Sequence, residues 1–264
     1  MGWIITLGQI RTPFLDQFFS LMNLLDTKGF VFLVISIIWI GYHWRWGLRV
    51  GLIMMTSSIV NYSLKAIFQE PRPLQIDPSV GLIDVTGYSF PSGAAQSAVI
   101  LTGLSLIYIK SRWKWLIAAT YFPILSFSRV YISAHYVSDI LGGWLVGAIL
   151  LILFRYLYIP LEKRLEKKAP LYLIGFCEII GLIFYKTLYG AVIMSMGVGL
   201  VITYYAGVFL PPAKNVGAFI KRSLVGVAGV IPCLFLLTVS PFWASILATL
   251  WVSCGSQFVL KPLK

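Results

Sequence analysis

The chain has 264 residues, of which 59% are hydrophobic and 11% are charged, and its mean hydropathy is +0.87. A soluble domain of this length needs far more polar surface, so the composition excludes that class and predicts an integral membrane protein. The net charge of +12 does not indicate a nucleic-acid partner, because basic residues of membrane proteins collect in cytoplasmic loops. We expect the chain to have the lipid bilayer as its partner and not a nucleic acid.

The apolar runs predict helices, because a bilayer core of roughly 30 Å takes about 20 apolar residues per helix and backbone groups in lipid must be bonded within the segment. The expected fold is an all-α polytopic bundle of about nine transmembrane helices plus an N-terminal interfacial helix. Residues 1–28 form this N-terminal segment, because Arg11, Pro13 and Asp16 interrupt its apolar run. A short first span is the alternative.

Nine spans follow, with ends that vary by several residues. They are expected at 29–43, 47–68, 93–109, 114–128, 137–158, 170–187, 190–210, 224–239 and 242–259. Residues 29–160 then make a five-helix core, a charged cytoplasmic linker follows at 161–169, and 170–264 form a four-helix membrane extension.

The charges predict the orientation of these spans. Alternate connections share a membrane side, and one side collects 15 of the 21 basic residues. That side is expected to be cytoplasmic. The longest polar loop, 69–91, then lies on the non-cytoplasmic side, in the inner or plasma membrane.

Three of the basic residues left on the outer side lie near other polar groups at span ends: Lys65, Arg72 and Arg129. Burying cations at this depth costs desolvation energy unless an anion pairs with them.

His135 and Asp139 are four residues apart and are expected to share a helix face. The carboxylate can accept from one imidazole nitrogen and leave the other free to attack.

Ser92 and Gly93 stand at the start of a predicted helix, where free backbone N–H groups favour an anion. Three segments on one membrane face therefore offer cations, a helix N-terminus and an oriented histidine. This combination predicts a phosphate site with a nucleophile.

Three motifs carry a family resemblance: KAIFQEPRP, FPSGA and SRVYISAHYVSD. They resemble, in order and spacing, the K-x6-RP, PSGH and SR-x5-H-x3-D signatures of the type 2 phosphatidic acid phosphatase superfamily of integral-membrane lipid phosphate phosphatases. The resemblance covers about residues 29–158.

The resemblance implies a role for each matched residue. Lys65, Arg72 and Arg129 would bind phosphoryl oxygens, assisted by Ser92 and the Gly93 amide. His135 would be the nucleophile that forms a phosphohistidine, and Asp139 would orient it. No metal or other cofactor is implied.

The chain departs from the family pattern at position 94, where Ala94 replaces the histidine that acts as general acid on the leaving alcohol. His43 lies on the predicted cytoplasmic face and cannot substitute. Losing a general acid costs about 10²–10⁴-fold, so we expect a crippled or inactive phosphatase. An engineered variant and a natural pseudo-enzyme are both open explanations.

The C-terminal half carries no catalytic motif. Its spans resemble the extra helices of sphingosine-phosphate phosphatases, or they pack on the core or form a homodimer contact. Glu178 is a carboxylate in the middle of a predicted span. It is either a functional residue or a structural group that is hydrogen-bonded to a neighbouring helix. Candidate substrates are phosphatidic acid, phosphatidylglycerol phosphate, an isoprenoid pyrophosphate and a sphingoid phosphate. A lipid-phosphate binding or translocating protein and a lipid phosphotransferase are the alternative functions.

Overall fold

The computed structural model describes residues 11–165, 175, 179–180, 183, 188–236 and 238–261. Every regular element in these ranges is helical, which confirms the predicted all-α class for this part of the chain. The chain divides into two compact units. Unit 1 comprises Met1–Phe30 and Thr56–Tyr158, and unit 2 comprises Val31–Met55 and Ile159–Lys264.

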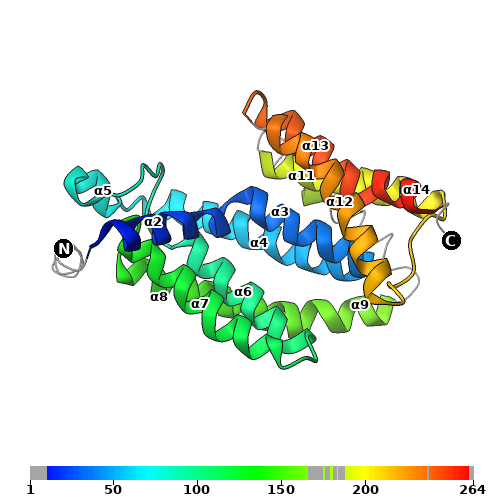
Figure 1. Cartoon of the computed structure of the whole chain (residues 1–264), viewed down its shortest axis with the longest axis horizontal. Coiled ribbons are helices and arrows are strands. Elements are labelled where there is room, and N and C mark those ends of the chain that lie inside the picture. Colours follow the sequence, from blue (N-terminus) through cyan, green and yellow to red (C-terminus); the bar gives the residue numbers. More distant parts are fainter. Residues whose placement is uncertain are drawn as a thin grey trace. The chain divides into compact units, whose positions relative to one another are not determined.

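Unit 1 is built on three helices that lie side by side, with α6 in contact with both α7 and α8 (Figure 1). Its elements are α2 (Pro13–Met22), η1 (Asn23–Asp26), the end of α4 (Trp44–Phe68), α5 (Pro73–Ile76), η3 (Pro78–Val80), α6 (Gly93–Tyr108), α7 (Trp113–Tyr131), α8 (Val137–Leu153) and η4 (Phe154–Tyr158).

The contact between α6 and α8 depends on two glycines one helical turn apart, Gly143 and Gly147. A side chain at Gly143 would meet the carbonyl oxygen of Ser92, and one at Gly147 would lie 2.8 Å from that of Gln96. Small residues at this spacing let two membrane helices approach closely. The glycines therefore hold the start of α6 against the start of α8.

The N-terminal segment packs on α7. Thr12 caps α2 by accepting from the Leu15 N–H, and Pro13 occupies its first turn, where no N–H is needed. The Phe19 ring lies 4.4 Å from that of Tyr131, whose hydroxyl donates to Asp16 at 2.7 Å. The predicted helix is present; its position in the membrane interface stays a prediction.

Unit 2 contains the remaining helices. They are most of α3 (Lys28–Ser36), η2 (Ile37–Tyr42), the start of α4, α9 (Ile159–Leu165), α11 (Leu188–Tyr205), α12 (Val216–Leu236), α13 (Pro241–Leu250), η6 (Trp251–Gly255) and α14 (Ser256–Leu260). Within this unit Arg49 pairs with Glu162 at 2.8 Å, and α11 packs against α13. Glu178 and most of the predicted span 170–187 lie outside the described residues.

The predicted count of nine spans is not confirmed. In the described part, four helical stretches are long and apolar enough to cross a membrane: Trp44–Ile76, Val137–Arg164, Val216–Leu236 and Pro241–Leu260. A fifth results if Pro13–Asp26 and Gly29–Tyr42, bent by 56°, are one span. Apolar runs such as Gly93–Tyr108 form helices shorter than a full span, because polar residues or turns end them early.

Candidate active site

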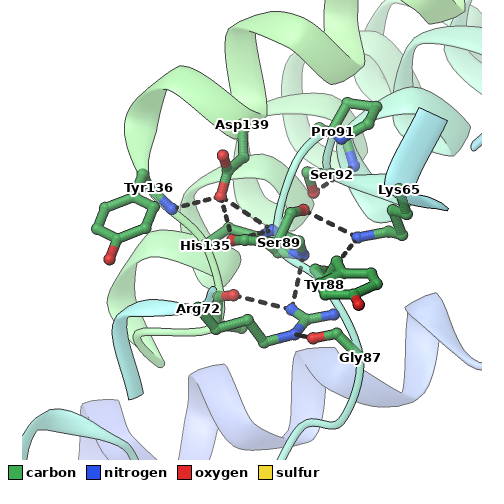
Figure 2. Close-up of polar contacts among 12 residues, drawn as sticks. Lys65, Arg72, Gly87, Tyr88, Ser89, Pro91, Ser92, His135, Tyr136 and Asp139 are labelled. Carbon is green, nitrogen blue, oxygen red and sulfur yellow. Dashed lines mark hydrogen bonds and ion pairs between the residues drawn. The ribbon is translucent and has the colours of Figure 1, made fainter. Parts of the chain in front are cut away.

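The motif residues of unit 1 come together where four helix ends meet (Figure 2). Lys65 lies in the last turn of α4 and Arg72 immediately precedes α5. Ser92 precedes α6 as its N-cap, and Asp139 lies in the first turn of α8. His135 lies in the turn between α7 and α8, where the carbonyl of Arg129 accepts from its N–H at 3.2 Å.

The His135 and Asp139 side chains are both buried and lie next to each other. Oδ2 of Asp139 is 3.3 Å from Nδ1 of His135, and it also accepts from the backbone N–H of Tyr136 at 2.8 Å and from the Ser89 hydroxyl. A carboxylate at Nδ1 holds the proton on that nitrogen, so Nε2 carries the free lone pair. Burial lowers the pKa of His135 to about 4, which keeps the imidazole neutral and nucleophilic.

Arg72 reaches the other nitrogen of this imidazole. Its Nη1 lies 3.1 Å from Nε2 of His135 and donates to the Ala134 carbonyl at 2.8 Å, while Nε donates to the Gly87 carbonyl at 2.9 Å. The side chain is buried in unit 1. A phosphoryl group approached by Nε2 would therefore be within reach of a fixed guanidinium.

Lys65 holds the end of the 69–91 loop. Its Nζ donates to the backbone carbonyls of Tyr88 and Ser89, the latter at 2.8 Å (Figure 2). The ammonium therefore lies beside Ser89, the residue that contacts both His135 and Asp139.

The third cation, Arg129, contacts the N-terminal segment. Nη1 of Arg129 donates to Asn23 at 2.7 Å and to Asp26 at 3.2 Å, and Nε donates to the Ser128 hydroxyl at 3.1 Å. Nη2 is buried and has no hydrogen-bond partner among the described residues. A buried donor of this kind is rarely left unpaired, so Nη2 suits a ligand oxygen.

Ser92 and Gly93 form the start of α6 as expected. The Ser92 hydroxyl accepts from the Ala95 N–H at 3.4 Å, and the Ser92 N–H donates to the Asp139 carbonyl at 3.0 Å. Gly93 lies against Asn61, whose Oδ1 would be 3.2 Å from an added Cβ. The helix start therefore lies next to Asp139, the partner of the histidine.

Ala94 does not face a polar pocket. It is 2% exposed and packs with Ala98 and Leu125, and Leu25 and Tyr121 cover the same cluster together with Phe122. A histidine at this position would require the neighbouring apolar side chains to change rotamer.

Several contacts were missed by the sequence analysis. The only feature of the sequence that could have indicated Ser89 is that it lies close to Ser92. Its contacts with His135 and Asp139 form only when the loop is folded. Gln96 bridges Asn61 and the Ser57 hydroxyl, at 3.1 and 2.7 Å. Asn23 and Asp26 lie in a segment that the analysis assigned to the interface, about a hundred residues from their partner Arg129.

No group of three or more His, Cys, Asp or Glu side chains in the described ranges is arranged to hold a metal ion.

The part of the chain that carries this site is similar to known proteins. A family model described as the PAP2 superfamily matches residues 46–162. Phosphatidylglycerophosphatase B of Bacillus subtilis is 28% identical over 159 residues, which are 55% of this chain and 76% of the relative. Undecaprenyl-diphosphatase of Sulfolobus acidocaldarius is 28% identical over 107 residues, 38% of this chain and 51% of the relative. The chain therefore spans about half the length of the second relative.

A solved structure shares the fold. The crystal structure of a transmembrane PAP2-type phosphatidylglycerolphosphate phosphatase from Bacillus subtilis aligns with a TM-score of 0.51 at 24% identity, covering 62% of this chain and 84% of that one. Together with the apolar helices, this likeness identifies the chain as an integral membrane protein.

Proposed function

We propose that the chain hydrolyses a lipid phosphomonoester or pyrophosphate through a phosphohistidine, because residues 46–162 match the PAP2 superfamily model and the relatives named above are phosphatases. The observation that carries the proposal is the buried contact of Asp139 with one nitrogen of His135 and of Arg72 with the other. A buried, oriented imidazole suits nucleophilic attack on phosphorus, and the guanidinium beside the attacking nitrogen can turn from that nitrogen to the phosphoryl oxygens when a substrate binds.

In the proposed first step, Nε2 of His135 attacks phosphorus while its Nδ1–H donates to Asp139. The carboxylate stabilises the positive charge that develops on the ring. Arg72, Lys65 and Arg129 bind the phosphoryl oxygens, together with Ser92 and the N–H of Gly93. Positioning and electrostatics supply most of the rate in such a transfer. In the second step water attacks the phosphohistidine and releases phosphate.

Position 94 supplies no proton to the leaving oxygen in this mechanism, because alanine has no ionisable group. An alkoxide is a poor leaving group without a proton, and the loss of a general acid costs about 10²–10⁴-fold. Turnover on alkyl substrates therefore depends on a proton from elsewhere.

The substrate is proposed to be a lipid with an anionic head at the membrane surface. The names of the two relatives point to phosphatidylglycerophosphate and undecaprenyl diphosphate as probes; phosphatidic acid and a sphingoid phosphate complete the panel. The site is proposed to lie on the non-cytoplasmic side, on the basis of the basic-residue asymmetry.

The test is phosphate release from this panel by the purified chain and its Ala94→His and His135→Asn variants. We expect release by at least one of the two forms that keep His135, an acid-labile phosphoenzyme on rapid quench, and neither with His135→Asn. Substrate binding without release by any form would instead indicate a lipid-phosphate binding protein. Transfer of the phosphoryl group to a second lipid would indicate a phosphotransferase.

A further inference from the structure

The N-terminal segment brings a second carboxylate into the site. Oδ2 of Asp26 lies 3.2 Å from Nη1 of Arg129, and Asn23 accepts from the same nitrogen at 2.7 Å. Both residues belong to η1, within unit 1. This contact does not follow from the family motifs, which begin at Lys65.

Asp26 acts on the same cations as Asp139. Asp26 contacts Arg129 directly, and both carboxylates are close enough to Lys65 and Arg72 to interact with them electrostatically. Asp139 is committed to the imidazole, because its Oδ2 already faces His135, Ser89 and the Tyr136 N–H. Asp26 contacts Arg129 but not the imidazole, so it is a carboxyl group beside a phosphate-binding cation that the mechanism above leaves unused.

The residue before Asp26 lies beside position 94. This residue, Leu25, packs on the apolar cluster of Ala94, Ala98 and Leu125. The segment that covers the small residue at position 94 therefore also carries an acid to the same end of the site. The Asp26 side chain is 31% exposed, against 3% for Arg129, so it is the less enclosed member of this ion pair.

We propose that Asp26 donates the proton to the leaving oxygen in this chain, in place of the side chain that position 94 lacks. This inference rests on the proposed phosphatase function. A phosphoryl group bound to Lys65, Arg72 and Arg129 neutralises the cations that favour an ionised Asp26 and adds negative charge beside it. Both effects favour the protonated carboxyl at the moment when substrate is bound.

The reaction has two steps. In the first, Nε2 of His135 forms the N–P bond, the electron pair of the breaking P–O bond goes to the leaving oxygen, and the Asp26 proton joins that oxygen. In the second, the Asp26 carboxylate takes a proton from the attacking water, a new P–O bond forms, and the N–P electron pair returns to Nε2. Asp26 ends protonated and His135 neutral, as at the start.

The test compares an alkyl substrate, dioctanoyl phosphatidic acid, with an aryl one, para-nitrophenyl phosphate, whose leaving group needs little protonation. We expect Asp26→Asn to lower kcat on the alkyl substrate by about 10²–10⁴-fold and on the aryl substrate by less than about 10-fold. Ala94→His should restore alkyl turnover in the Asp26→Asn background and add less than about 10-fold in the native one, since the two groups then supply the same proton.

Two variants separate proton donation from positioning. Asn23→Ala removes the neighbouring contact to Arg129 without removing an acid, and it should affect both substrates alike. Asp16→Asn changes another carboxylate of the same segment, one that bonds Tyr131, and should leave the alkyl-to-aryl ratio unchanged.

Equal losses on the two substrates with Asp26→Asn would overturn the proposal and make Asp26 a positioning residue for Arg129. Alkyl turnover by the Ala94→His form but not by the native chain would also overturn it, while leaving the phosphatase function intact. Absence of His135-dependent release in every form would instead refute the phosphatase function itself.

Discussion

At the scale of single residues, the environment of His135 fixes its protonation. The imidazole is buried, and burial disfavours its charged form, so its pKa falls to about 4. An ordinary histidine with a pKa near 6.5 is about three quarters protonated at pH 6, whereas His135 is expected to be neutral there. Between these two values the unfolded chain binds a proton that the folded chain does not, so folding stability falls as pH is lowered through that window.

The measurement is an NMR pH titration of the chain with ¹⁵N-labelled histidine. The chain contains only His43 and His135, so a His43→Gln variant assigns both sets of signals. We expect His135 to titrate near pH 4, with the proton of its neutral form on Nδ1. A midpoint near 6.5 would show that the ring is not held in this buried environment.

The sequence predicted that Arg72 and Asp139 share a site with His135, but not how Asp139 reaches the imidazole. The spacing of four implied a shared helix face, whereas His135 lies in the turn before α8 and only Asp139 is in the first turn of that helix, so the contact runs from the helix back to the preceding turn. Ser89 and Asp26 could not be found in this way. Their contacts depend on how the 69–91 loop and the N-terminal segment fold over α7 and α8, and spacing along the chain carries no information on that.

At the scale of elements, the site depends on how closely α6 and α8 approach. The Ser92 carbonyl lies where a side chain on Gly143 would be. Gly143→Ala should therefore shift the start of α6, and with it Ser92, away from the Asp139 carbonyl that accepts its N–H. Strain from overpacking typically costs about 1–3 kcal/mol, so we expect a lower melting temperature and at least about a 10-fold loss of phosphate release.

Gly217→Ala is the matched control, because an added Cβ there would meet only Asn215 at 3.5 Å, an ordinary contact. Melting in detergent and phosphate release are measured on both variants. A Gly143→Ala protein with native stability and activity would show that α6 and α8 have room to separate without disturbing the site.

Helix positions were predictable to within a few residues where capping signals exist. The predicted 93–109 span corresponds to α6 at Gly93–Tyr108, which begins after its Ser92 cap. The predicted 224–239 span was less accurate, since α12 begins at Val216 and includes Lys221 and Arg222. Lys221 and Arg222 were assigned to a loop because they are charged. Long charged side chains are tolerated near a helix end when their charged groups extend to the polar surroundings.

At the scale of the whole molecule, composition predicted the membrane class but not the number of spans. Hydropathy cannot distinguish a full span from a shorter buried helix such as α6, or from the bend of 56° between Pro13–Asp26 and Gly29–Tyr42. The domain limits at 160 and 170 and a homodimer through the C-terminal helices stay predictions. Contacts within the structure group residues 31–55 with the C-terminal part of the chain, a pairing that no local pattern indicates.

The orientation of the chain is the remaining prediction, and it follows from the distribution of basic residues. Thr86 in the 69–91 loop and Ser111 between α6 and α7 lie beyond opposite ends of α6, and both are exposed. If the 15 basic residues of one side face the cytoplasm, Thr86 lies outside and Ser111 inside. In a chain with Cys177, Cys233 and Cys254 replaced by alanine, Thr86→Cys should react with an impermeant thiol reagent in intact cells. Ser111→Cys should react only after lysis, and the reverse result would place the phosphate site on the cytoplasmic side.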